Sequence, residues 1–131
     1  MNRLVVKLQS GEVRSLGFTV KTRTTLLQED GTYFKPMDLT EYVVDFRIKL
    51  YPYDSVDAIV AKEITTEEDT TLGWIYAPAQ GKFRVDFTQD DMDVLVPGKE
   101  YYLIIRLING ETKIIISGEG NNVGTLMVCN S

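Results

Sequence analysis

Short segments in which apolar and polar residues alternate recur along almost the whole chain, and turn residues separate them. The clearest of these segments is residues 42–51. There Val44, Phe46 and Ile48 point to one side of an extended chain, and the mostly charged residues between them point to the other. Such a pattern, with almost no helical periodicity, is typical of an antiparallel β-sandwich. We therefore expect an all-β fold of about eight or nine strands.

Further segments are expected to form strands, and among them Phe83, Val85 and Phe87 alternate with Lys82, Arg84 and Asp86. These segments are residues 3–8, 16–25, 58–64, 73–78, 82–87, 100–108, 111–117 and 124–129. Residues 28–37 are expected to be a loop, because Asp30-Gly31 and Pro36 are typical turn residues.

One short helix is expected at about residues 89–95. Thr88 and Asp91 have the spacing of a capping box, in which each side chain accepts a hydrogen bond from the backbone N–H of the other residue. Pro97 and Gly98 follow and end the helix, because proline lacks a backbone donor and glycine favours a turn.

Two phrases of the sequence resemble a known family. The first is T-x-x-D-x-x-x-L-x-P-G-x-x-Y-x-L, formed by Thr88, Asp91, Leu95, Pro97, Gly98, Tyr101 and Leu103. The second is D-L-T-x-x-x-V-x-F-x-I, formed by Asp38, Leu39, Thr40, Val44, Phe46 and Ile48. Together they resemble small immunoglobulin-like β-sandwich domains of tailed bacteriophages, found at the N-terminus of upper-baseplate proteins and in short head or tail accessory proteins. The resemblance covers about residues 16–129 and implies an immunoglobulin-like β-sandwich with a structural role in a virion.

The core is expected to form from the apolar side of the alternating segments, with one residue added by the helical turn. The expected core residues are Phe18, Val20, Val44, Phe46, Ile48, Phe83, Val85, Phe87, Leu95, Tyr101, Leu103, Ile105 and Ile116.

The pair Asn109-Gly110 is the strongest local turn pattern, because both residues tolerate the positive φ of a type I′ turn. A two-residue loop at these positions would place Ile108 opposite Glu111 and Arg106 opposite Lys113. One face of the hairpin would then join the core through Leu103, Ile105, Leu107, Ile114 and Ile116. The other face carries the candidate interface residues Tyr102, Ile104, Arg106, Ile108, Lys113 and Ile115.

This second face is too apolar for plain exposure to solvent, and two arrangements would cover it. Either residues 3–8 or the insert at residues 58–79 folds back over it, or another subunit does, since contiguous exposed apolar patches usually mark interfaces. Adjacent Arg106 and Lys113 would also favour a nearby carboxylate. That group would come from a neighbouring subunit or from Glu63, Glu67, Glu68 or Asp69.

Residues 1–15 are expected to form an extended N-terminal arm ahead of a β-sandwich domain at residues 16–131. Leu4, Val5 and Val6 make the arm apolar enough to pair with a strand, and extended segments readily add to a sheet edge. We expect the arm to pack on a neighbouring subunit or on the outer sheet of its own domain. These three residues are therefore further interface candidates.

The net charge of −5 argues against an electrostatic nucleic-acid binder, which usually has a basic face. No apolar run approaches the roughly 20 residues of a membrane span. Residues 1–13 do not match a signal peptide, because Lys7 interrupts their short apolar patch. With Cys129 as the single cysteine, no disulfide can form within this sequence, which agrees with a reducing cytoplasm.

No catalytic, cofactor or metal site is expected. The sequence has no histidine, the commonest general base and a frequent zinc ligand. Cys129 consequently has no histidine to activate it as a nucleophile. Asp90, Asp91 and Asp93 lack the spacing of a calcium loop and suit the first turn of a helix instead.

The leading hypothesis is a non-enzymatic accessory protein of the head, tail or baseplate of a tailed bacteriophage. It would be made in the bacterial cytoplasm, reside in the virion, and dock on other virion proteins or on copies of itself, with no nucleic acid or membrane as partner. The alternative is a carbohydrate- or receptor-binding module, in which exposed aromatic side chains would stack on the ligand. The candidates for that role are Tyr51, Tyr53, Trp74 and Tyr76.

Overall fold

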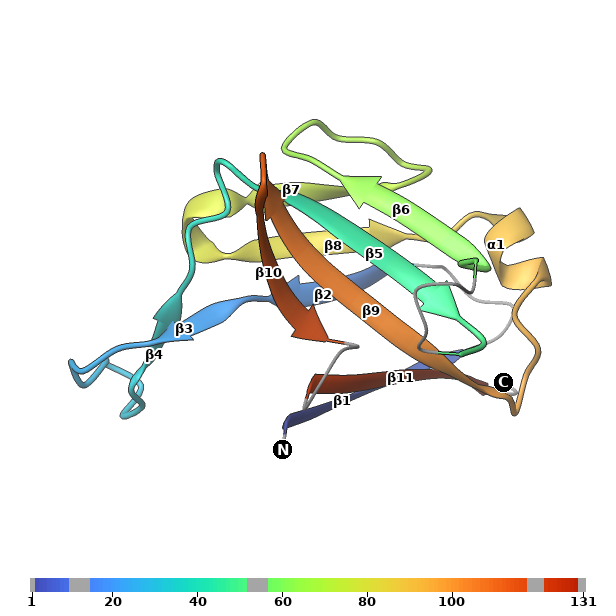
Figure 1. Cartoon of the computed structure of the whole chain (residues 1–131), viewed down its shortest axis with the longest axis horizontal. Coiled ribbons are helices and arrows are strands. Elements are labelled where there is room, and N and C mark those ends of the chain that lie inside the picture. The colour runs from blue at the N-terminus through green and yellow to red at the C-terminus, as the bar shows by residue number, and fades with distance from the viewer. Residues whose placement is uncertain (1, 10–14, 52–56, 118–121, 130–131) are drawn as a thin grey trace.

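The structure, a computed structural model, describes residues 2–9, 15–51, 57–117 and 122–129, and the side chains within residues 15–51, 57–114 and 124–126. In this part of the chain there are eleven strands, one short α-helix and one 3₁₀ turn (Figure 1). The expectation of an all-β, sandwich-like fold with one short helix is confirmed.

The elements follow one another in the order that the alternating segments predict, and β3, β4 and η1 are additional to the predicted ones. They are β1 (Asn2–Gln9), β2 (Ser15–Thr19), β3 (Lys21–Arg23), β4 (Phe34–Pro36), β5 (Val43–Lys49), β6 (Val60–Ile64), β7 (Gly73–Ala77), η1 (Pro78–Gln80), β8 (Lys82–Asp86), α1 (Gln89–Asp93), β9 (Glu100–Asn109), β10 (Thr112–Ser117) and β11 (Asn122–Cys129).

The larger sheet is built around the long strand β9. Its strand order is β1-β11-β9-β5-β6, and β10 also pairs with β9. One edge of β9 is occupied by β5. Along the other edge, β10 pairs with residues 105–109 and β11 with residues 100–102. A single strand therefore organises most of this sheet.

A smaller sheet of order β2-β8-β7 lies behind the larger one in Figure 1. The core fills the space between the two sheets. Phe46 of β5 packs against Phe18 of β2 with ring centroids 6.3 Å apart, and against Phe87 after β8 at 6.0 Å. Contacts of this kind between aromatic rings join the two layers.

Most of the predicted core is confirmed. The buried members are Val20, Val44, Phe46, Ile48, Phe83, Val85, Phe87, Leu95, Tyr101, Leu103 and Ile105. Phe18 is only partly buried and packs against this cluster, while the side chain of Ile116 lies outside the described ones. Leu107, which was expected to join the core from the β9–β10 hairpin, is buried as well. Several buried residues were not predicted, namely Leu39, Val60, Ile64, Ile75, Met92 and Leu126. The insert at residues 58–79 thus supplies core strands as well as a loop.

The predicted register of the β9–β10 hairpin is wrong. Asn109 pairs with Thr112, so the two-residue loop is Gly110-Glu111. Gly110 has a φ of 58°, and none of the described residues other than glycine has a positive φ. This pattern suits a type II′ turn, whose first central position is glycine, and not the type I′ turn that Asn109-Gly110 suggested. The shift moves the register by two residues, so residues 112–115 keep their predicted faces. A bulge between Ile115 and Ser117 then places Ser117 opposite Ile105, on the other face.

Two segments depart from the predicted strands. Residues 16–25 do not form one strand, because the chain leaves β2 at Val20 and continues as β3. Residues 28–37, predicted as a loop, contain β4, and the pair Lys21–Pro36 closes an antiparallel hairpin of β3 and β4. Both differences belong to the same feature, a hairpin outside the sandwich.

The predicted N-terminal arm adds to a sheet of its own chain. Strand β1 pairs with β11 in parallel, from Asn2 opposite Asn122 to Gln9 opposite Cys129. All other strand pairs of the described residues are antiparallel. The arm therefore takes the second of the two placements considered, an edge of the larger sheet.

Helix α1 has the predicted capping box. The Thr88 hydroxyl accepts a hydrogen bond from the Asp91 N–H at 3.2 Å, and the Asp91 carboxylate accepts one from the Thr88 N–H at 2.8 Å. The helix ends at Asp93, two residues earlier than predicted, and places Met92 and the following Leu95 in the core.

Candidate functional site

The candidate interface residues of the β9–β10 hairpin do not form one exposed patch. Ile104 is 1% exposed and Arg106 is 9% exposed. Tyr102 and Ile108 are partly buried, and Lys113 is exposed. The chain itself therefore covers the middle of this face. The remaining candidates, whose side chains lie outside the described ones, are Ile115, Leu4, Val5 and Val6.

Arg106 and Lys113 are not opposite each other, which corrects the predicted pairing. Lys113 is opposite Ile108, and Arg106 is opposite Asp45 on β5. Asp45 in turn is opposite Glu63 on β6. The acidic residue beside Arg106 in the sheet is thus supplied by β5, and Glu63, one of the predicted partners, lies one strand further away.

A shallow depression lies where β5, β6 and β9 approach the β9–β10 turn. Its volume is about 320 Å³, and it is lined by Glu41, Val43, Asp45, Arg47, Glu63, Ile108, Asn109 and Gly110. The Nε of Arg47 donates a hydrogen bond to Oδ1 of Asp45 at 3.0 Å, so these two charges offset each other. Glu41 and Glu63 are exposed and form no ion pair with any described residue. We call this surface the acidic depression.

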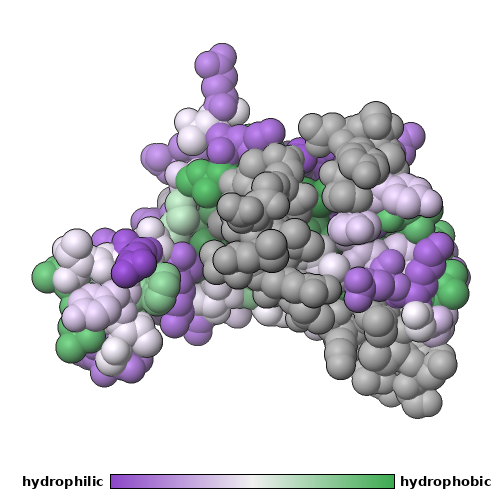
Figure 2. Space-filling view, turned by 60° about the horizontal axis from the view of Figure 1, so that its bottom comes forward, coloured by the Kyte–Doolittle hydropathy of each residue, from purple (hydrophilic) through white to green (hydrophobic). Residues whose placement is uncertain are grey.

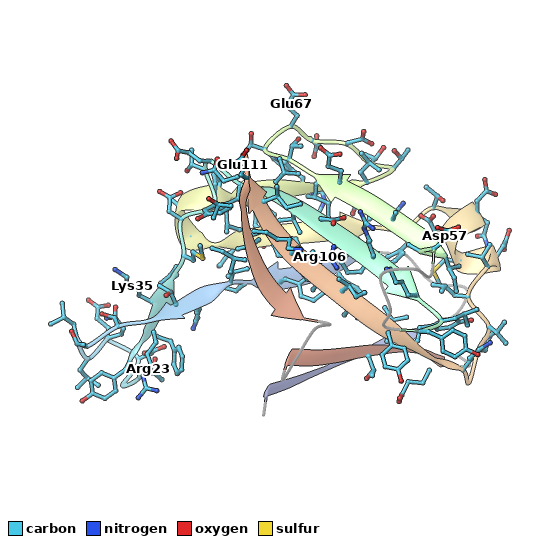
Figure 3. All side chains as sticks on the ribbon, viewed as in Figure 1. Arg23, Lys35, Asp57, Glu67, Arg106 and Glu111 are labelled. Carbon is cyan, nitrogen blue, oxygen red and sulfur yellow. The ribbon has the colours of Figure 1, made fainter. Side chains whose placement is uncertain are left out.

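The negative charge continues beyond the acidic depression. A second hollow of about 290 Å³ shares Glu63 and is lined by Thr65, Glu67, Glu68, Asp69, Leu72 and Gly73. Figure 3 shows Glu67 and Glu111 at the same end of the molecule. This end of the sandwich therefore favours a basic partner.

The two most exposed large apolar side chains among the described residues, Leu26 and Leu27, lie on the hairpin of β3 and β4. This hairpin points away from the body of the molecule at the left of Figure 1. We call residues 21–36 the projecting hairpin. None of its residues is buried. Figure 2 shows it as a separate lobe with apolar patches on its surface. Its large apolar side chains, with their exposed fractions, are Leu26 (71%), Leu27 (63%), Tyr33 (49%) and Phe34 (49%).

Hydrogen bonds within the projecting hairpin define its shape. The Thr24 N–H donates to the carbonyl oxygen of Tyr33 at 2.7 Å, and the Gln28 N–H donates to that of Thr32 at 2.8 Å. At the tip, Oδ1 of Asp30 accepts bonds from both the N–H and the hydroxyl of Thr32, at 3.0 and 2.8 Å. These two bonds, that of the hydroxyl first, lower the pKa of Asp30. The hairpin is thus ordered by polar contacts and not by a core of its own.

Gly81 fixes the root of the projecting hairpin to the body. The Val20 N–H donates to the Gly81 carbonyl oxygen at 2.8 Å, and the Met37 N–H donates to that of Val20 at 3.0 Å. Gly81 has a φ of 70°, and a Cβ there would lie 2.4 Å from the Val20 oxygen and 2.8 Å from the Met37 oxygen. A side chain therefore does not fit, and a backbone contact sets where the hairpin leaves the sandwich.

The candidate sugar-binding aromatics are partly engaged within the chain. The rings of Trp74 and Tyr76 lie 6.1 Å apart. The Arg84 guanidinium lies 5.3 Å from the centre of the Trp74 ring, and the indole N–H donates to the Thr66 carbonyl oxygen at 3.0 Å. One face and the hydrogen-bond donor of the indole are therefore already used. Of the other two candidates, Tyr51 is exposed and Tyr53 lies outside the described residues.

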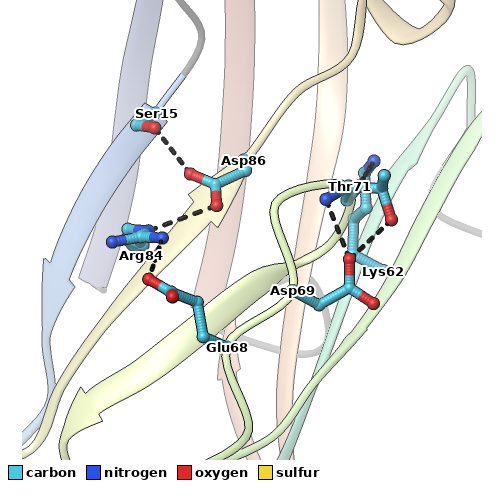
Figure 4. Close-up of polar contacts among 7 residues, drawn as sticks. All are labelled: Ser15, Lys62, Glu68, Asp69, Thr71, Arg84 and Asp86. Atoms are coloured by element: carbon cyan, nitrogen blue, oxygen red, sulfur yellow. Dashed lines mark hydrogen bonds and ion pairs between the residues drawn. The ribbon is translucent and has the colours of Figure 1, made fainter.

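Arg84 also holds residues 65–71, which we call the acidic loop, against the smaller sheet. Its guanidinium forms ion pairs with Glu68 at 3.1 Å and with Asp86 at 3.2 Å. The second carboxylate oxygen of Asp86 accepts a bond from the Ser15 hydroxyl at 2.6 Å (Figure 4). This network links the loop to β8 and β2, so residues 65–71 are structurally anchored.

The acidic residues of α1 have structural partners too. Asp91 completes the capping box and pairs with Lys62, and Asp93 accepts a hydrogen bond from the Gln89 side chain at 2.9 Å. Among the described residues, no three His, Cys, Asp or Glu side chains are grouped so that they could hold a metal ion. Likewise, none of the described helices is long and apolar enough to span a membrane.

The chain matches no known family model and no curated protein.

Proposed function

We propose that this protein is a non-enzymatic structural component of a tailed-bacteriophage virion, a head, tail or baseplate accessory protein that docks on other virion subunits. The resemblance of residues 38–48 and 88–103 to phage immunoglobulin-like domains supports this role. The observation that carries the proposal is the projecting hairpin, because its four large apolar side chains are exposed in the single chain.

Docking on another subunit stabilises the projecting hairpin. A two-stranded hairpin without a core is only marginally stable in water, and a cluster of exposed apolar side chains is typical of an interaction site. Contact with another subunit takes these side chains out of water and adds apolar contacts to the hydrogen bonds that order the hairpin. In a particle, many identical contacts act together, so each of them need not be strong.

The experiment that tests this role measures entry of the protein into particles. A tagged copy carrying Leu26→Ser, Leu27→Ser, Tyr33→Ser and Phe34→Ser is produced in bacteria during phage growth, and particles are purified by sedimentation. We expect the wild-type copy to sediment with the particles and the variant to stay behind. All four positions are exposed, so the variant should fold normally.

The matched control replaces exposed apolar residues elsewhere, with Val94→Ser and Val96→Ser, which are 49% and 55% exposed. This control should enter particles like the wild-type protein. Absence of the wild-type protein from purified particles, or equal entry of the hairpin variant, would overturn the proposal.

A carbohydrate- or receptor-binding module is less well supported. The Trp74 ring, its best stacking surface, is covered on one face by Arg84. A glycan array separates the two roles, because the virion subunit proposed here gives no glycan signal.

A further inference from the structure

We propose that the projecting hairpin of one copy docks into the acidic depression of a second copy, which gives a head-to-tail contact between identical chains. This inference names the partner for the assembly role proposed above and rests on it.

The projecting hairpin combines apolar side chains with cations. Lys21 lies 3.8 Å from Asp30, so these two charges offset each other. Arg23 and Lys35 are exposed and have no carboxylate partner within the described residues. Figure 3 shows both on the hairpin, away from the body of the molecule. The hairpin thus offers two free cations beside its exposed apolar residues.

The acidic depression offers the complementary groups. Glu41 and Glu63 are two exposed carboxylates without a cation partner among the described residues, and Val43 and Ile108 add apolar surface to the lining of the same depression. Its volume of about 320 Å³ leaves room for a large apolar side chain. An apolar contact ringed by opposite charges gives both attraction and a preferred orientation.

Geometry excludes a contact within one chain. Figure 1 shows the projecting hairpin pointing away from the β9–β10 turn, which borders the depression. The hairpin therefore reaches only the depression of another copy. Because the two surfaces differ, each copy can donate a hairpin and accept one, and such a heterologous contact builds a ring or an open chain.

The contact is expected to be weak for a single pair. One hairpin tip buries less surface than a stable interface of about 1,200 Å² requires. The wild-type protein should therefore be monomeric when dilute and form oligomers as its concentration rises. Added salt should weaken this association, because exposed charges are screened.

The test exchanges the charges of the two surfaces in the full-length chain. One variant carries Glu41→Lys and Glu63→Lys in the depression, and the other carries Arg23→Glu and Lys35→Glu on the hairpin. All four positions are exposed, so both variants should melt like the wild-type protein. Sedimentation velocity over a wide concentration range measures association.

Each variant alone should associate at least about tenfold more weakly than the wild-type protein, because like charges then face each other. A mixture of the two variants should recover association, since each depression then meets a hairpin of opposite charge. Matched control substitutions on a different face, Asp90→Lys and Lys99→Glu, should leave association unchanged.

A wild-type protein that stays monomeric at every concentration, or a mixture that fails to recover, would overturn this inference. The outcome is separable from the test of the proposed function. If the protein is monomeric alone while the hairpin variant is still lost from particles, the hairpin docks on a different virion protein. In that case the proposed role in the virion is supported, and the contact between two copies of this chain is rejected.

Discussion

The Nζ of Lys62 lies 2.5 Å from Oδ2 of Asp91, an ion pair that joins strand β6 to the first turn of helix α1. Lys62 also donates a hydrogen bond to the Thr71 carbonyl oxygen and its side chain is only 5% exposed. Asp91 at the same time caps the helix through Thr88. The Lys62 ammonium therefore connects strand β6 both to the helix, through Asp91, and to the acidic loop, through Thr71.

Replacing Asp91 with Asn should lower the free energy of unfolding by about 3 kcal/mol, because it leaves the buried Lys62 ammonium without its counter-charge. Urea unfolding measures the change. Asp90→Asn is the matched control, since Asp90 is exposed in the same turn, and should cost only a few tenths of a kcal/mol through the helix dipole. Equal losses in the two variants would contradict the structural role of the pair.

The same pair predicts how stability depends on pH. Burial raises the pKa of Asp91, but the hydrogen bond from Lys62, that from the Thr88 N–H and the charge of Lys62 together lower it below its ordinary value of 3.8. The folded state thus holds the proton more weakly than the unfolded state. The stabilisation is complete above the unfolded pKa and is lost as the pH falls through the folded one. We expect the wild-type protein to lose stability below about pH 4 more steeply than Asp91→Asn, as measured by thermal melting across that range.

Gly81→Ala should destabilise the protein by more than about 1 kcal/mol, because both the positive φ and the close Val20 carbonyl oxygen oppose a Cβ. Gly98→Ala is the matched control. Gly98 has a φ of 84°, yet a Cβ there would meet nothing within 4 Å, so only the backbone cost of about 1 kcal/mol remains. Thermal melting of both variants separates the cost of the steric contact from the cost of the positive φ. A smaller loss of stability for Gly81→Ala than for Gly98→Ala would contradict the contact with the Val20 oxygen.

The core prediction can be tested at Phe46, which is fully buried between Phe18 and Phe87. Phe46→Ala should cost about 3–5 kcal/mol, because it leaves a cavity between the sheets. Phe34→Ala, at an exposed position of the projecting hairpin, should change stability by no more than about 0.5 kcal/mol. Urea unfolding compares the two, and similar losses would mean that the hairpin belongs to the folded core.

Alternation predicted most of the strands and of the core because strands such as β5 and β6 bury one face. It could not predict that β9 is buried on both faces from Leu103 to Leu107. The capping box of Thr88 and Asp91 was equally readable, since its partners lie three residues apart. The register of the β9–β10 hairpin could not be predicted, because Asn109-Gly110 and Gly110-Glu111 are both acceptable two-residue turns. Local sequence alone does not choose between them.

The two proposed surfaces could not be located from the sequence. The projecting hairpin was missed because residues 16–25 alternate as one strand, whereas the chain leaves the sheet at Val20, where its N–H bonds to Gly81. The one available indication was the placement of Leu26-Leu27 and Tyr33-Phe34 on either side of the turn at Asp30. The acidic depression combines residues from β5, β6 and β9, so only the topology brings them together.

The last prediction concerns the independence of the sandwich from the projecting hairpin. Replacing residues 23–34 by Asn-Gly joins Thr22 to Lys35, which pair across the hairpin, through a turn that the two residues favour. None of the removed residues is buried, and the root bonds of Val20 and Met37 remain. The free energy of unfolding should therefore stay within about 1 kcal/mol of the wild-type value.

The shortened protein should also expose less apolar surface, so a dye that binds such surface should give a weaker signal with it than with the wild-type protein. Urea unfolding and dye fluorescence measure the two effects on the same samples. A loss of several kcal/mol would show that the hairpin stabilises the sandwich itself. Its exposed apolar residues would then stabilise the folded chain, and their exposure would no longer indicate a docking surface.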